Sequence, residues 1–142
     1  MIALFVAAVL AAQSASPDLA WTWTLYEDAQ PVVLAHEVPD TANLRTTLDC
    51  EPGSSVARFM LYGAPSLTGM ARVTAGDASA VAEAAAARGG ASKLALRTDH
   101  PVFAAFTVDG QLTVAVGDQR RAVEVPPAHL AKLRRFAELC SG

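Results

Sequence analysis

The sequence predicts an α+β domain that is mainly antiparallel β, either a sandwich or a partly open barrel. A short helix near residues 100–106 and a C-terminal helix packed on the sheet complete the prediction. From residue 20 onward, short segments alternate apolar and polar side chains and are separated by turn residues at intervals of about ten positions. Near the end of the chain, two prolines precede an apolar stripe with helical spacing.

Three alternating segments open the domain, at residues 21–26, 32–38 and 44–50. The first places Trp21 and Trp23 on one face, because successive side chains of a strand point to opposite faces. The second places His36 on the same face as three aliphatic residues. In the third, the alternation turns Cys50 toward the interior.

The middle of the chain predicts three or four more strands. A strong turn at 51–54 precedes residues 56–62, which are apolar on both faces and therefore central in a sheet. Residues 70–74 and 93–97 also alternate. For 78–88 the signals conflict: its alanines favour a helix, but no apolar stripe with helical spacing is present. We favour a strand there and keep a helix as the alternative.

The last third of the chain predicts a helix, a hairpin and a second helix. His100 and Pro101 are typical of a helix start, and this helix extends through Phe106. Two residues, 117–118, separate two alternating runs, which is the spacing of a tight hairpin. That pairing gathers one apolar face, made of Leu112, Val114, Val123 and Val125. The apolar stripe of the last helix consists of Leu130, Leu133, Phe136, Ala137 and Cys140.

The domain organisation is predicted as a signal peptide at 1–16 and a single β-rich domain at 17–142. The apolar run at 2–12 is too short to span a bilayer as a helix, and small residues follow it. No Lys or Arg precedes the run, so an uncleaved anchor is the alternative. We expect no membrane span in the mature chain. Alanine is over-used and arginine far outnumbers lysine, which suggests a high-GC bacterium and a periplasmic or secreted protein.

The two cysteines, Cys50 and Cys140, are predicted to form a disulfide. One lies at the inward end of a strand and the other on the apolar stripe of the last helix. In the chain-entropy model, a loop of about 90 residues destabilises the unfolded state by roughly 4 to 5 kcal/mol. The alternatives are two buried thiols or a two-cysteine metal site. Two cysteines without neighbouring histidines are a poor zinc set, so we expect no metal.

Charge and motifs exclude several function classes. The formal net charge of −3 is spread along the chain, which disfavours nucleic acid as a partner. Neither a phosphate-binding loop nor a dinucleotide fingerprint is present, and we expect no cofactor. Ser54 and Ser55 lack the elbow motif of serine hydrolases and are better explained as turn residues. Asp49 and Glu51 flank Cys50 at a strand end, where solvated charge is the simplest interpretation.

The histidines lie far apart in the sequence and are interpreted one by one. His36 on an apolar strand face is typical of a hydrogen-bonded core or edge residue. His100 beside Asp99 indicates helix capping. His129 on the first turn of the last helix is expected at the surface. Catalytic use of any of them is the less favoured alternative.

Two candidate binding surfaces remain. Arg120, Arg121, Lys132 and Arg135 would form a positive patch for an anionic surface if the last hairpin and helix lie side by side. Trp21 and Trp23 belong to the core if both point inward. On an exposed edge strand they would instead stack on a sugar or a peptide.

Several segments carry a resemblance to known proteins, namely WTWTLY, VLAHEVPDT, LDCEPGS, DHPVFAAF and RFAELC. With these segments the chain resembles small exported proteins of alphaproteobacteria without assigned activity. It is more distantly similar to the invasion-associated locus B proteins, which are small, exported and β-rich. The resemblance rests on tryptophan, cysteine and turn positions, so it implies export and a β-rich fold but no catalytic residue.

The function that we expect is a non-enzymatic periplasmic or secreted module that binds a protein or a cell-envelope component. No concentrated polar constellation is visible, and such a domain is more easily a binder than a catalyst. A proteinase-inhibitor-like β domain is one alternative. A small secreted hydrolase that uses His36, Asp99 and His100 is the other.

Overall fold

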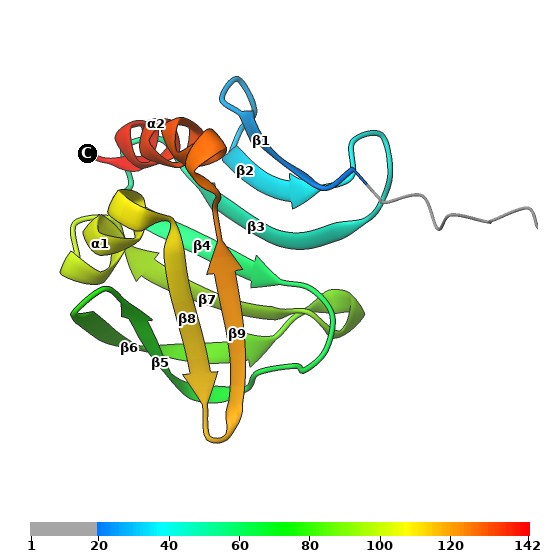
Figure 1. The fold of residues 1–142 in the computed structure, drawn as a ribbon, viewed down its shortest axis with the longest axis vertical. Helices are drawn as coiled ribbons and strands as arrows, with labels where there is room; N and C mark the ends of the chain where they lie inside the picture. The colour runs from blue at the N-terminus through cyan, green and yellow to red at the C-terminus, as the bar shows by residue number, and fades with distance from the viewer. Residues whose placement is uncertain (1–19) are drawn as a thin grey trace, which may run out of the picture.

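Residues 20–142 fold into an antiparallel sheet of nine strands that curls into a half-barrel, with two helices packed against it (Figure 1). The computed structural model describes residues 20–142. The predicted signal peptide at 1–16 lies outside the described residues. The sequence predicted a sandwich or a partly open barrel, and the curled sheet confirms the partly open barrel.

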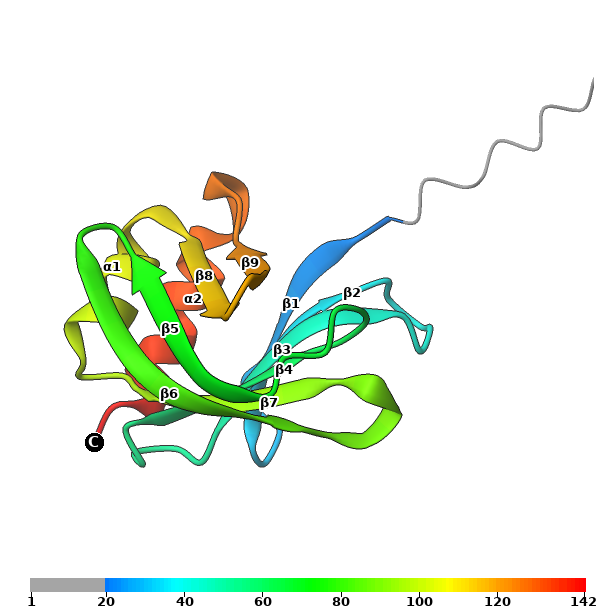
Figure 2. The same cartoon turned by 90° about the horizontal axis from the view of Figure 1, so that it is seen from below.

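The strands are β1 (Thr22–Tyr26), β2 (Val32–Glu37), β3 (Leu44–Cys50), β4 (Val56–Leu61), β5 (Gly69–Ala75), β6 (Ala78–Ala86), β7 (Ser92–Arg97), β8 (Gln111–Val116) and β9 (Gln119–Glu124). Their order in the sheet is β1-β2-β3-β4-β7-β6-β5-β8-β9, and every neighbouring pair is antiparallel. The curl brings the two edge strands, β1 and β9, near each other (Figure 2). The space between them is the open seam of the half-barrel.

The alanine-rich segment at 78–88 forms a strand over most of its length, as predicted. In β6, buried Ala82 and Ala84 alternate with exposed Val81 and Glu83. The strand pairs with β5 along its first part and with β7 at its end. Hydrogen bonding to two neighbours outweighs the intrinsic helix preference of alanine, because propensity is a weak prior beside tertiary context.

The first predicted helix is confirmed and is longer than expected. Helix α1 covers Pro101–Asp109, and the Nδ1 atom of His100 accepts the backbone N–H of Val102 at 3.0 Å. The prediction ended the helix at 106, but the chain offers no stop signal until Gly110. That glycine has φ 76°, and a Cβ there would lie 2.1 Å from the carbonyl oxygen of Val125.

The C-terminal helix α2 (Leu130–Cys140) packs its predicted stripe into the core. A single 3₁₀ turn at Pro127–His129 precedes it, and another at Arg88–Gly90 connects β6 to β7. Leu133, Phe136 and Cys140 are buried. The aromatic part of the core lies between the sheet and the helices, where Phe59, Phe103 and Phe106 meet with ring centroids 5.9 to 6.3 Å apart. Such contacts are a large part of a small domain's stability.

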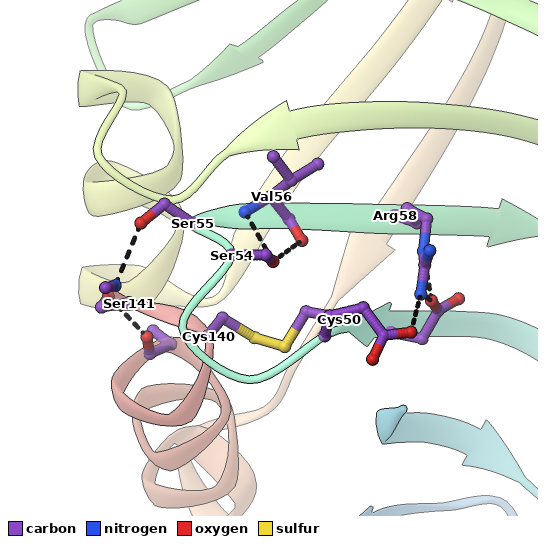
Figure 3. The surroundings of a disulfide bond; sticks show 11 residues. Cys50, Ser54, Ser55, Val56, Arg58, Cys140 and Ser141 are labelled. Atoms are coloured by element: carbon purple, nitrogen blue, oxygen red, sulfur yellow. Dashed lines mark hydrogen bonds and ion pairs between the residues drawn. A yellow bond between two sulfur atoms is a disulfide. The ribbon is translucent and has the colours of Figure 1, made fainter. Parts of the chain in front are cut away.

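The predicted disulfide between Cys50 and Cys140 is present and joins the end of β3 to the end of α2 (Figure 3). The Cα atoms of the two residues are 5.8 Å apart. Beside the disulfide, the N–H groups of Gly53 and Ser55 donate to the carbonyls of Leu139 and Cys140 at 3.1 and 2.7 Å. The bond is consistent with an oxidising, extracytoplasmic compartment.

The serines of the turn after β3 have the structural role that their setting predicted. The Oγ atom of Ser54 accepts the N–H of Val56 at 3.3 Å, and the Oγ atom of Ser55 accepts the N–H of Gly142 at 3.0 Å. These bonds hold the turn and the C-terminus together beside the disulfide (Figure 3). Within residues 20–142, neither helix is long and apolar enough to cross a membrane.

Candidate functional site

A polar pocket of about 440 Å³ lies at the open seam of the half-barrel. We call it the seam pocket, and its lining residues are His36, Arg45, Thr46, Tyr62, Arg121, Ala122 and Glu124. They come from β2, from β3, from the residue after β4, and from β9. The mouth of a curled sheet is a recurrent place for ligand sites, because the sheet supplies a rigid wall and the open edge gives access.

The wall on the side of β2 and β3 is set by the sheet register. Trp23 pairs with His36, and His36 pairs with Thr46, so the three side chains form a row across the first three strands. Trp23 and Thr46 are buried, whereas His36 is partly exposed. The row therefore presents an imidazole and a hydroxyl to the pocket.

An array of stacked rings orders this wall. The indole of Trp23 lies parallel to the imidazole of His36, with centroids 4.7 Å apart and an interplanar angle of 8°. Trp21 meets the same imidazole edge-on at 5.5 Å. The Cζ atom of Arg45 lies 4.0 Å from the centroid of the Trp21 ring. The guanidinium is thereby held by a cation–π contact at the rim of the pocket.

Two hydrogen bonds attach Trp23 to other elements, one across the seam to β9 and one to α2. Its Nε1–H donates to the backbone carbonyl of Glu124 on β9 at 3.0 Å. Its backbone carbonyl accepts from the Nζ atom of Lys132 on α2 at 2.6 Å. The first and last strands of the sheet are thus connected by a side chain rather than by a strand ladder, which leaves room for the pocket beside them.

Arg121 attaches the loop after β4 to β9. Its guanidinium donates to the carbonyls of Tyr62 at 2.6 Å, Gly63 at 3.0 Å and Pro65 at 3.3 Å. Desolvation by burial lowers the pKa of Arg121, which stays charged at physiological pH because its normal value is far higher. Arg121 therefore adds positive charge to the pocket while most of its donors are occupied.

His36 is surrounded by groups that disfavour its charged form. Burial lowers its pKa, and the charges of Arg45 and His129 lower it further. The imidazole is consequently neutral at neutral pH. His129 was expected at the surface, but it is half-buried at the start of α2. Its Nδ1 atom is buried and has no hydrogen-bond partner among the described residues.

Three of the four residues of the predicted positive patch contact other groups of the protein, and the fourth lies apart from them. Arg121 is engaged with carbonyls, and Lys132 is engaged with Trp23. Arg135 pairs with Glu27 and Glu138, at 3.3 Å each. Arg120 is exposed on β9 near the β8–β9 turn, at the opposite end of that strand from α2 (Figure 1).

Of the two alternatives for the tryptophans, the core position holds for Trp23. Trp23 is a core residue with 1% of its surface exposed, so it offers no ring to a ligand. Trp21 is partly exposed but already carries Arg45 on its face. At this edge of the sheet, Trp21 therefore contacts the guanidinium of Arg45 and Trp23 contacts the imidazole of His36, so the pair does not present two open aromatic faces for stacking.

The residues of the hydrolase alternative do not line one pocket. Asp99 makes a bidentate ion pair with Arg97, at 2.9 and 2.8 Å, and this pair lowers the pKa of Asp99. His100 caps α1. Only His36 of the three lines the seam pocket.

A second hollow of similar volume lies on the outer face of β3, β4, β7 and β6. Asp49 and Arg58 form an ion pair on its wall, and Glu51 joins that pair at 3.7 Å. The carboxylates that flank Cys50 are therefore engaged with an arginine. Among residues 20–142, no three His, Cys, Asp or Glu side chains are gathered as a metal site would require. In the seam pocket, by contrast, Arg45 and Glu124 form no ion pair with other described residues, so the seam pocket is the better candidate site.

Sequence reasoning missed five members of the seam pocket: Arg45, Thr46, Tyr62, Ala122 and Glu124. Each belongs to an ordinary alternating strand or to the residue after one, so no local motif marks it. The one signal is that Arg45 directly precedes Thr46, whose side chain faces inward on β3. Trp21, the partner of Arg45, lies just before β1 and cannot be inferred from spacing.

Comparison with known proteins gives no assignment: no protein-family model, no curated protein and no solved structure matches this chain.

Proposed function

We propose that this protein is a non-enzymatic periplasmic or secreted module whose seam pocket binds a protein or cell-envelope component. The observation that carries the proposal is the ordered array of Trp21, Arg45 and His36 beside an open polar pocket. The disulfide supports an oxidising compartment. The resemblance to small exported proteins of alphaproteobacteria agrees with that location.

The array is prepared for binding because its groups are held before any partner arrives. A ligand that meets a rigid, oriented cation loses less of its binding free energy to ordering of side chains. Trp21 holds Arg45, and the strand register holds His36. The same observation favours binding over catalysis, since the stacked imidazole is positioned by two indoles and not by a carboxylate that would orient a base.

Immobilised full-length protein, exported and purified in its oxidised form, tests the proposal with an envelope extract of the producing bacterium. We expect a retained component that Arg45→Ala and Trp21→Ala release and that Arg72→Ala does not. Arg72 is the matched control because it is exposed on β5 and lies outside the seam pocket. Equal retention by wild type and Arg45→Ala would contradict a role for the pocket.

A substrate screen separates this function from the hydrolase alternative. We expect no turnover of ester, peptide or glycoside substrates by the oxidised protein. Turnover that disappears when His36, His100 and His129 are substituted together would replace the binding function with an enzymatic one.

A further inference from the structure

Two opposite charges line the seam pocket without meeting. Arg45 and Glu124 both line it, and neither side chain makes an ion pair within 4.0 Å with another of the described residues. Other described arginines donate to carboxylates or to backbone carbonyls: Arg58, Arg97, Arg134 and Arg135, and also Arg121 of the same pocket. Arg45 combines a position in a pocket with unused donors.

The stacking of Arg45 leaves its hydrogen-bonding edge available. One face of the guanidinium lies over the Trp21 ring, 4.0 Å from its centroid. The N–H groups of a guanidinium lie in its plane, so a ring against its face does not consume them. They form the fork that fits a carboxylate with two parallel hydrogen bonds. Arg121 behind the same pocket adds positive charge that favours an anion there.

Glu124 is fixed on the other side of the pocket through its main chain. Its carbonyl accepts the indole N–H of Trp23 at 3.0 Å, which holds this end of β9 against β1. Its side chain is exposed. A carboxylate in that position accepts hydrogen bonds and favours a cationic donor such as an ammonium group.

The volume of the pocket and the contacts of the two neighbouring indoles restrict the class of ligand further. A volume of about 440 Å³ is within the range of small-molecule sites and exceeds what a single ion needs. Trp21 carries Arg45 on its face and Trp23 carries His36. The two indoles on which a sugar would stack are already engaged, which disfavours a saccharide.

We infer that the seam pocket binds a small zwitterion of the amino acid or short peptide class, with its carboxylate on Arg45 and its ammonium group on Glu124. This inference rests on the proposed binding function and names the ligand chemistry of the same pocket. The envelope component would then present, or be, a peptide with both termini free.

Titrations followed by NMR test the inference with three probes: glycylglycine, N-acetylglycylglycine, which lacks the ammonium group, and glycylglycinamide, which lacks the carboxylate. The indole N–H signals of Trp21 and Trp23 report binding, because both rings contact His36, which lines the pocket, and Trp21 also carries Arg45. We expect glycylglycine to bind about tenfold more tightly than either blocked form, as the loss of one charged hydrogen-bonded contact implies.

Variants assign each charge to its partner. Arg45→Ala should abolish the preference for glycylglycine over the amide, and Glu124→Gln should abolish the preference over the acetylated form. Arg72→Ala and Glu83→Gln are the matched controls outside the seam pocket and should keep both preferences.

Equal affinity for the free and the blocked probes would overturn the inference, and so would the absence of any shift in the Trp21 signal. If the probes fail while an envelope component is still retained through Arg45, the ligand class is wrong and the binding function stands. If retention also fails, the proposed function itself is wrong.

Discussion

Trp23 and His36 lie directly opposite each other on β1 and β2, with their rings parallel and 4.7 Å apart. The same tryptophan donates its indole N–H across the seam to Glu124. One core residue therefore orders the wall of the seam pocket and also fixes the distance between the two edges of the sheet. The stability of the fold and the shape of the candidate site are coupled through this residue.

The Trp23 hydrogen bond is expected to contribute measurably to stability. Trp23→Phe keeps an aromatic ring but removes the donor, which leaves the Glu124 carbonyl without this partner. We expect the free energy of unfolding to fall by about 1 to 3 kcal/mol, measured by denaturant titration. Trp21→Phe is the control because no hydrogen bond of the Trp21 indole is seen among the described residues. An equal loss in both variants would show that ring size, not the hydrogen bond, is responsible.

The disulfide should account for a large share of the stability. A Cys50→Ala, Cys140→Ala variant is expected to unfold at a clearly lower denaturant concentration, with a loss of about 2 to 5 kcal/mol. Cys50 and Cys140 are 90 residues apart, and a cross-link over a long loop restricts the unfolded chain. Equal unfolding midpoints for the oxidised protein and the variant would contradict this account.

The two faces of α2 should differ in their contribution. Phe136 is fully buried, so Phe136→Ala is expected to cost about 3 to 5 kcal/mol through lost contacts and a cavity. Arg134 is exposed and donates to the carbonyls of Thr107 and Val108 at the end of α1. Arg134→Ala should cost no more than about 1 kcal/mol. A larger loss from Arg134→Ala in chemical denaturation would mean that the helix faces are wrongly assigned.

The lowered pKa of His36 makes stability depend on pH. When the pH falls below 6.5, the ordinary pKa of histidine, the unfolded chain takes up a proton at His36 more readily than the folded protein does. Stability should therefore be constant from about pH 8 to 7 and fall as the pH drops below about 6.5. The folded imidazole faces the charges of Arg45 and His129, and Glu124 lies across the pocket.

Urea unfolding of wild type and His36→Gln at several pH values checks this dependence. The variant should lose less stability between pH 7.5 and 5.5 than wild type loses. His100→Gln is the control because His100 caps α1 and does not line the seam pocket. Parallel pH profiles for wild type and His36→Gln would show that other groups cause the acid sensitivity.

The sequence alone determined the features that depend on neighbours along the chain. Alternation predicted the strands, the two-residue spacing predicted the β8–β9 hairpin, and Leu112 and Val123 are indeed paired on its buried face. The Cys50–Cys140 disulfide followed from one inward strand position and one position on the apolar stripe of α2. The strands, the hairpin and the inward position of each cysteine are local features, because a strand or helix turns its side chains with a fixed period.

Only the tertiary structure decided which strands meet. β7 lies between β4 and β6, and β5 pairs with β8, although no local pattern specifies either pairing. The fate of the alanine-rich β6 followed from those pairings, because its two neighbours satisfy its backbone hydrogen bonds.

The seam pocket depends on the same long-range arrangement. Arg45 is at the pocket because it stacks on Trp21, and Glu124 is there because Trp23 holds β9 across the open seam. Arg121, which was predicted to belong to a basic patch, instead donates to three backbone carbonyls after β4. Side chains from separate strands converge only when the whole sheet curls, and the register and curl of a sheet are properties of all its strands together.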